Sequence, residues 1–137
     1  MNKNVIQEII INLNVNLIYT AIHNFRNLKI WQESIVLAEK IYIVTSQFPE
    51  TEKYGLTNQM RRCSVSIPSN IAEGSSRTSE KEFKHFLSIS LGSAFELFTQ
   101  LELANRLGMV DRNQTTEISE LIGITERKIS AFMKHRQ

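Results

Sequence analysis

The 137-residue chain is poor in the residue types from which catalytic centres and disulfide-stapled domains are built. Its single cysteine, Cys63, has no internal disulfide partner, and its place in an apolar helical register indicates a reduced structural thiol in the cytosol. The three histidines lie far apart in the sequence, so we expect no metal centre. The 5 glycines form neither a phosphate-binding loop nor a Gly-x-Ser-x-Gly elbow. We therefore expect no enzyme activity, no catalytic residue, no cofactor and no small-molecule substrate.

The chain also has neither a marked charge excess nor a long hydrophobic run. Its 16 basic residues nearly balance its 14 acidic residues, so only the distribution of charge over the folded surface can indicate a nucleic-acid partner. The apolar residues near the N-terminus are interrupted by Glu8, Asn12, Asn14 and Asn16, which leaves neither a signal-peptide core nor a membrane span of about 20 residues. We expect a cytoplasmic protein without a membrane partner.

What the chain does have is enough apolar content, 42%, for one buried core, in a length too short for two ordinary domains. We place this domain at residues 25–137, after an N-terminal extension at residues 1–24. An Ile-rich spacing in the extension favours a short helix that packs on the domain, whereas its asparagines are compatible with an unordered tail, and both interpretations stay open. The residues with this spacing are Ile6, Ile9, Ile10, Leu13 and Leu17.

Four amphipathic segments, separated by capping or helix-breaking signals, follow the extension. They predict an all-α protein that folds as an antiparallel up-down-up-down four-helix bundle, because short connections make each helix start near the end of its predecessor. The expected end signals are Asn27 and Phe48-Pro49 for the first helix, residues 55 and 74 for the second, a Ser79/Glu82 capping box and Gly108 for the third, and Asp111 with Gln114 for the fourth.

Apolar residues outnumber the positions that one inward row per helix requires. The third helix has an inward row from Phe83 to Ala104 with strict alternation of four and three, yet several phenylalanines lie off this row. The first helix carries two apolar rows side by side. Either the core is broad or a second surface meets another subunit. The candidates for an oligomer interface are Trp31, Tyr42, Phe86, Phe95 and Phe98.

A polar stripe interrupts the second helix between Ser66 and Gly74. Pro68 leaves the carbonyl of Ser64 without its helical partner, at a cost of about 3 kcal/mol unless a kink or a polar group absorbs it. One interpretation is a solvated stripe with a Glu73–Arg77 ion pair. The other is a polar network that fixes helix register, in which a carboxylate pair is the one candidate for acid–base chemistry. The residues of this network are Ser66, Asn70, Glu73, Ser93 and Glu96.

Helices that alternate in direction would collect basic residues at one pole of the bundle. This basic pole unites the start of the first helix, the turn between the second and third, and the end of the fourth, with seven cations against Glu73, Glu80 and Glu82. Such a cluster could contact phosphates without reading bases. The residues that we expect to bind nucleic acid are Arg26, Lys29, Arg77, Lys81, Lys84, Lys134 and Arg136.

Several separated motifs occur in an order that resembles one family, the bacterial four-helix-bundle proteins called 23S rRNA intervening sequence proteins. The resemblance covers about residues 25–135 and implies a homopentamer, with structured RNA or the ribosome as a partner. The motifs are Phe25 to Trp31, Phe48-Pro49, Gly55-Leu56-Thr57, Gln59-Met60-Arg61-Arg62, the Ser66 to Gly74 segment, and Gly92-Ser93 with Glu96.

Two function classes stay open on these grounds. The first is an RNA-associated scaffold that uses the basic pole, and the second is a homo-oligomeric protein-interaction module that binds no nucleic acid. Leu91 and Phe98 depart from the family pattern, which usually has a basic and an acidic residue there. This departure weakens the case for a charged contact on that face of the third helix.

Overall fold

The computed structural model describes the backbone of residues 2–135 and the side chains of residues 2–14 and 24–135. Every regular element in this part of the chain is helical, which confirms the all-α class. Two short 3-10 turns, η1 and η2, precede the second and third α-helices. The elements are α1 (Lys3–His23), η1 (Phe25–Asn27), α2 (Lys29–Thr45), η2 (Glu50–Glu52), α3 (Leu56–Ser75), α4 (Glu80–Arg106) and α5 (Arg112–Lys134).

Three of the expected helix-end signals are confirmed. The Ser79 hydroxyl oxygen accepts a hydrogen bond from the backbone N–H of Glu82 at 3.1 Å, and the hydroxyl donates back to the Glu82 carboxylate. The Asp111 carboxylate accepts from the backbone N–H of Gln114 at 2.7 Å. Gly108 follows α4 with a φ of +76°, the left-handed conformation that glycine adopts without a Cβ clash.

The predicted cap at Asn27 is wrong. Asn27 lies inside η1, and Leu28 occupies the position before α2 without a side-chain hydrogen bond to the helix. Packing fixes the entry of the chain instead, because Phe25 meets the edge of Trp31 at 5.3 Å between ring centroids and Leu28 packs against the core. The start of α2 therefore depends on apolar contacts, which a cap preference does not reveal.

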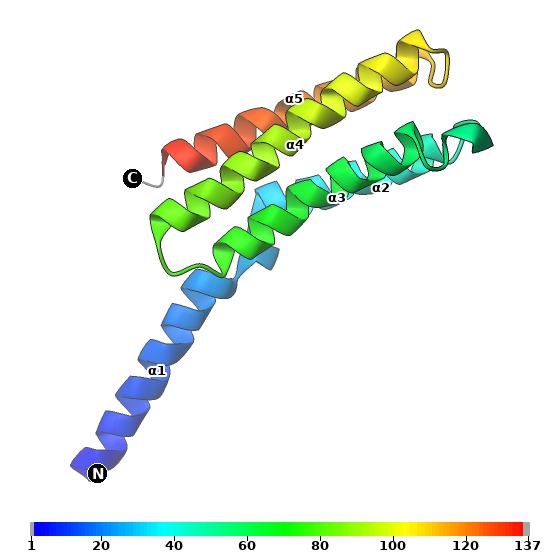
Figure 1. The fold of residues 1–137 in the computed structure, drawn as a ribbon. Coiled ribbons are helices and arrows are strands. Elements are labelled where there is room, and N and C mark those ends of the chain that lie inside the picture. The colour runs from blue at the N-terminus through cyan, green and yellow to red at the C-terminus, as the bar shows by residue number, and fades with distance from the viewer. Residues whose placement is uncertain (1, 136–137) are drawn as a thin grey trace.

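Helices α2 to α5 surround one hydrophobic core. Helix α3 packs against both α2 and α4, and α5 packs against α4 and α2 (Figure 1). The predicted inward row of α4 is buried throughout, as is one of the two apolar rows of α2. Cys63 of α3 is only half-buried. The inward residues of the other helices include Ile30, Leu37, Ile41, Val44, Met60, Ile67, Ile71, Ile118, Ile122 and Ile129.

Helix α3 continues through Pro68, which is buried. Next to the proline, the buried Ser90 hydroxyl of α4 donates a hydrogen bond to the Ile67 carbonyl at 2.9 Å. Because its side chain is small, Ser90 allows α4 to approach α3 closely. Its hydroxyl also supplies a donor to the buried Ile67 carbonyl.

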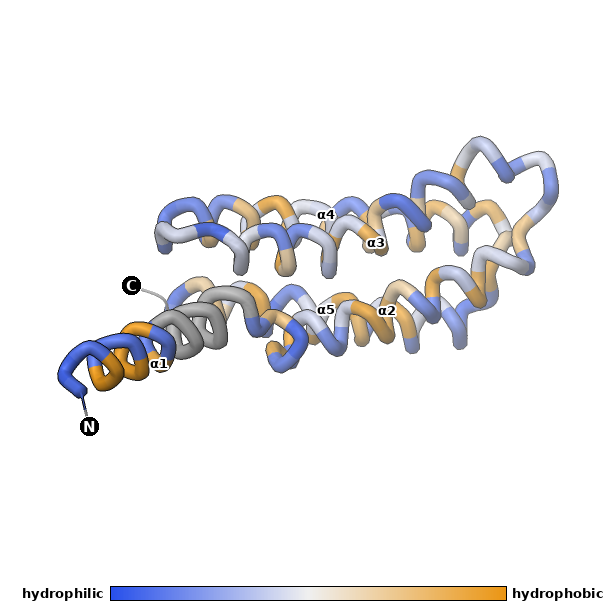
Figure 2. Tube along the Cα trace, turned by 90° about the horizontal axis from the view of Figure 1, so that it is seen from below, coloured by the Kyte–Doolittle hydropathy of each residue, from blue (hydrophilic) through white to orange (hydrophobic). Residues whose placement is uncertain are grey.

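Helix α1 projects from one end of the core helices and makes no extensive contact with α2 to α5 (Figure 1). Figure 2 shows apolar and polar positions alternating around its N-terminal half. All described side chains from Asn2 to Asn14 are exposed. The extension is therefore a 21-residue helix whose described apolar side chains, up to Leu13, are in contact with solvent.

Candidate nucleic-acid interface

The ends of four elements meet where the basic pole was expected. Phe83, near the start of α4, packs edge-on against Phe132, near the end of α5, at 5.8 Å between ring centroids. A Cβ on Gly74, at the end of α3, would come within 2.7 Å of the Phe83 ring, so α3 and α4 are in close contact there. The turn η1 contacts both α2 and α3. Figure 1 shows these ends together at the side of the core from which α1 leaves.

The basic side chains of this pole are mostly exposed, and few of them are neutralised. Lys84 is half-buried, whereas the other described cations are exposed, and Arg136 lies outside the described residues. Of the six described cations only Arg77 has an ion pair, with Glu73 at 2.6 Å, among the residues that the structure describes. The six are Arg26, Lys29, Arg77, Lys81, Lys84 and Lys134.

Two arginines of the pole are held in place by aromatic rings. The Arg77 guanidinium lies 4.9 Å from the centre of the Phe86 ring, and Arg26 lies 4.7 Å from the centre of the Phe25 ring. A guanidinium oriented in this way loses less freedom when it binds a phosphate. The arrangement is suited to phosphate contacts on a polyanion.

The structure divides the predicted polar network into separate parts. The Ser66 and Ser93 hydroxyls are 2.8 Å apart and join α3 to α4. The Asn70 amide donates to the Ser66 carbonyl at 2.8 Å and to the Ser66 hydroxyl at 3.0 Å, but it does not reach the Ser64 carbonyl that Pro68 leaves free. Glu73 lies apart from this group because it pairs with Arg77, as in the solvated-stripe interpretation.

Glu96 belongs to a different cluster. The Cys63 thiol donates to the Glu96 carboxylate at 3.3 Å and accepts from the Gln100 amide at 3.4 Å. Cys63 lies ten residues from Glu73 on α3, which is about 15 Å along a helix. The two carboxylates therefore do not form the pair that acid–base chemistry would require.

The environment of Cys63 opposes formation of a thiolate. Burial raises the pKa of the Cys63 thiol above its ordinary value, and the hydrogen bond to Glu96 raises it further. A thiol kept protonated is a poor nucleophile. This direction agrees with the structural role that the sequence indicates for Cys63.

Sequence reasoning missed a second cationic feature, a groove of about 650 Å³ between α2 and α3. The Arg61 guanidinium lies 4.7 Å from the centre of the Tyr42 ring and donates from Nε to the Thr45 hydroxyl at 2.9 Å. Arg62 and Asn70 line the same groove. The consecutive arginines Arg61 and Arg62 were the available signal in the sequence, but Tyr42, the partner of Arg61, comes from another helix.

Known proteins are similar to this chain over the region that contains helices α2 to α5. A sequence profile of the 23S rRNA-intervening sequence proteins matches residues 26–131, more than half of the chain. The chain belongs to this family. A crystal structure of a protein of unknown function from the S23 ribosomal protein family of Bacteroides thetaiotaomicron is similar to it, with a TM-score of 0.70 and 25% sequence identity. The match covers 77% of this chain and 98% of that chain. A search of curated proteins gave no match.

Family membership confirms the resemblance seen in the sequence and leaves α1 outside the matched residues. At the departures from the family pattern, Leu91 packs against the hydrophobic core, and Phe98 is 44% exposed. Leu91 thus contributes an apolar contact to the core.

The residues proposed from sequence as interface anchors do not form one surface. Trp31 and Tyr42 border hollows along α2, while Phe95 and Phe98 are exposed on α4, at 55% and 44%. Phe86 is half-buried at the pole beneath Arg77.

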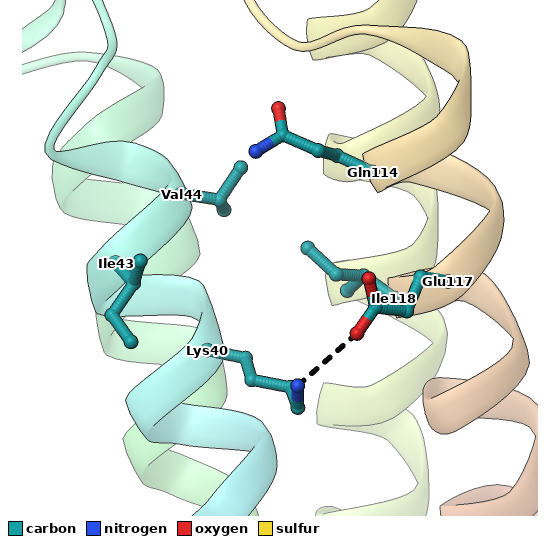
Figure 3. Close-up of a pocket in the computed structure, with 6 residues that line it drawn as sticks. All are labelled: Lys40, Ile43, Val44, Gln114, Glu117 and Ile118. Carbon is teal, nitrogen blue, oxygen red and sulfur yellow. Dashed lines mark hydrogen bonds and ion pairs between the residues drawn. The ribbon is translucent and has the colours of Figure 1, made fainter.

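A small cavity of about 130 Å³ lies between α2 and α5 (Figure 3). Lys40 and Glu117, which both line it, form an ion pair at 3.2 Å, so their charges compensate each other. Within the described part of the chain, no group of His, Cys, Asp and Glu side chains could hold a metal ion. None of the helices described has the length and apolar content needed to cross a bilayer.

Proposed function

We propose that this family member is a non-catalytic, homo-oligomeric scaffold of the cytoplasm that associates with structured RNA or the ribosome through its basic pole. The observation that carries the proposal is the meeting of six cations from η1, α2, the turn between α3 and α4, α4 and α5. Only one of the six is paired among the described residues. The name of the family, which links it to 23S rRNA, supports RNA as the polyanion.

In this proposal, the pole is formed by an up-down-up-down four-helix bundle of residues 25–137, and residues 1–24 are an extension. The contacts among α2 to α5 and the short turns between α3 and α4 and between α4 and α5 favour this topology. Resemblance to the family favours a ring of five subunits. A ring would repeat the pole around one axis and multiply the local positive potential.

Binding at such a pole depends on phosphate charge and shape. Lysines and arginines that replace condensed counterions give an affinity that falls with salt and varies little with base sequence. We expect Lys81→Glu/Lys84→Glu/Lys134→Glu to weaken binding to structured RNA by about tenfold or more at low salt, alike for unrelated sequences.

The matched control reverses Lys40, Lys53 and Arg112, which lie away from the pole and already have acidic partners. Filter-binding titrations, with circular dichroism to verify folding, provide the comparison. Equal weakening by both triple variants, or an absence of RNA binding by the wild type at low salt, would reject the proposal.

The alternative is a homo-oligomeric protein-interaction module that binds no nucleic acid. The exposed Phe95 and Phe98 on α4 are the observation in its favour, because adjacent exposed aromatic side chains are typical of protein interfaces. Loss of oligomerisation in Phe95→Ser/Phe98→Ser, in a protein that fails to bind RNA, would favour this alternative.

A further inference from the structure

Helix α1 exposes a large apolar surface although it packs little against the rest of the protein. Six large aliphatic side chains between Val5 and Leu13 are 40–56% exposed, and no core helix covers them extensively (Figures 1 and 2). Isolated helices of this length are marginally stable, and β-branched isoleucines lower their stability further. A partner that covers these side chains would stabilise α1.

Five of the six exposed side chains follow a seam geometry, and Ile11 lies outside it. Ile6, Ile10 and Leu13 are spaced by four and then three, and the same spacing in the sequence continues to Leu17. At 100° per residue Val5 and Ile9 lie beside them, so the stripe is about 140° wide. Spacing of this kind allows the a and d positions of two helices to interlock.

We propose that α1 is a self-association arm that packs against α1 of a second copy of this chain. Charge favours this occupant, because the positions flanking the seam hold Gln7 and Asn14, and Glu8 lies near the opposite side. Lys3, seven residues before Ile10, lies at the N-terminal end of the seam. An antiparallel pair of arms places the two lysines at opposite ends, so no like charges face each other across the seam. Helix α1 also carries few basic residues, whereas helices that lie on anionic lipid surfaces usually present Lys and Arg on the polar face.

The arm is an addition to the family fold. The family profile begins at residue 26, and the similar crystal structure matches 77% of this chain although 98% of that chain is covered. Association through α1 is therefore separate from any contact that the core helices make. A seam of 21 residues is about 31 Å long, so we expect it to associate weakly by itself and to reinforce contacts between the core regions.

The first test compares two charge substitutions in the full-length chain. Ile6→Asp/Ile10→Asp places two charges in the seam, and Gln7→Asp/Asn14→Asp adds the same charges beside it. We expect the seam variant to have a lower mean mass in sedimentation equilibrium at micromolar concentration, while the control retains the wild-type mass. Unchanged mass in both variants overturns the proposal. We expect the RNA affinity of the seam variant to be unchanged, so that the test of α1 is independent of the test of RNA binding at the basic pole.

The second test uses cross-linking to identify what covers the apolar stripe of α1. In a Cys63→Ser background, Leu13→Cys should form disulfide-linked dimers under mild oxidation, because Leu13 is near the middle of α1 and meets its counterpart in either pairing direction. Glu8→Cys, near the opposite side of the helix, should form at least tenfold fewer. Equal cross-linking at both positions overturns the proposal, as does sedimentation of the wild type with phosphatidylcholine vesicles that is lost in the seam variant.

Discussion

At the scale of single residues, hydrogen bonds join polar groups of α3 to α4, and we propose that their role is structural. Asn70 donates two hydrogen bonds to Ser66, and the Ser66 hydroxyl continues to Ser93 of α4. Asn70→Leu removes these donors and leaves the Ser66 carbonyl without the second partner. We expect a loss of roughly 1–3 kcal/mol in the free energy of unfolding.

Denaturant titration provides the measurement. Asn58→Leu is the matched control, because Asn58 is exposed on the same helix and has no hydrogen bond among the described side chains. A loss for Asn70→Leu within about 0.5 kcal/mol of the control would contradict the structural role.

The reactivity of the Cys63 thiol tests the cluster that Cys63 forms with Glu96 and Gln100. Its pKa is raised by burial first and then by Glu96, so replacing that carboxylate by a neutral amide lowers the pKa. We expect the rate of alkylation by iodoacetamide to rise at lower pH in Glu96→Gln than in the wild type. Since the folded pKa is the higher one, the contribution of the protonated thiol to stability is complete below the unfolded pKa and is lost as pH rises through the folded pKa. A midpoint that does not move in the variant would show that Glu96 has no influence on the thiol.

At the scale of elements, close contact between the end of α3 and the start of α4 supports the basic pole. A Cβ at Gly74 would lie 2.7 Å from Phe83 and 2.8 Å from Phe86, whereas a Cβ at Gly92 meets nothing within 4 Å. We expect Gly74→Ala to destabilise the protein by about 1–3 kcal/mol through overpacking. Gly92→Ala, in the interior of α4, should stabilise it by about 0.5–1 kcal/mol. Thermal melts compare the two, and equal effects would contradict the close contact.

The elements themselves were largely predictable from sequence, because their signals are local. The Ser79/Glu82 box, Asp111 and the buried row of α4 depend on spacing within one helix. The partners of Glu96 and Arg61 were not predictable, since each lies on another helix whose rotation the sequence does not specify. Asn27 failed as a cap because apolar packing at Leu28 determines where α2 begins.

At the scale of the whole molecule, the sequence has almost balanced charge, and we propose that the fold gathers basic residues at one pole. The pole from which α1 leaves combines six described cations with Glu73, Glu80 and Glu82, an asymmetry that the overall net charge of +2 does not reveal. We propose that assembly into a ring of subunits extends this surface. Light scattering at micromolar concentration should then give a mass near five times 15.8 kDa, and a protein that remains monomeric at high concentration would contradict the ring.

The salt dependence of RNA binding tests the role of the basic pole most directly. Each phosphate contact contributes roughly 0.7 to 0.9 to the magnitude of the slope of log affinity against log salt concentration. We expect Lys81→Gln/Lys84→Gln/Lys134→Gln to reduce that magnitude by about 2 to 3 for structured RNAs of unrelated sequence, and Lys40→Gln/Lys53→Gln/Arg112→Gln to leave it unchanged. Equal slopes for the wild type and the pole variant would contradict phosphate binding at the pole.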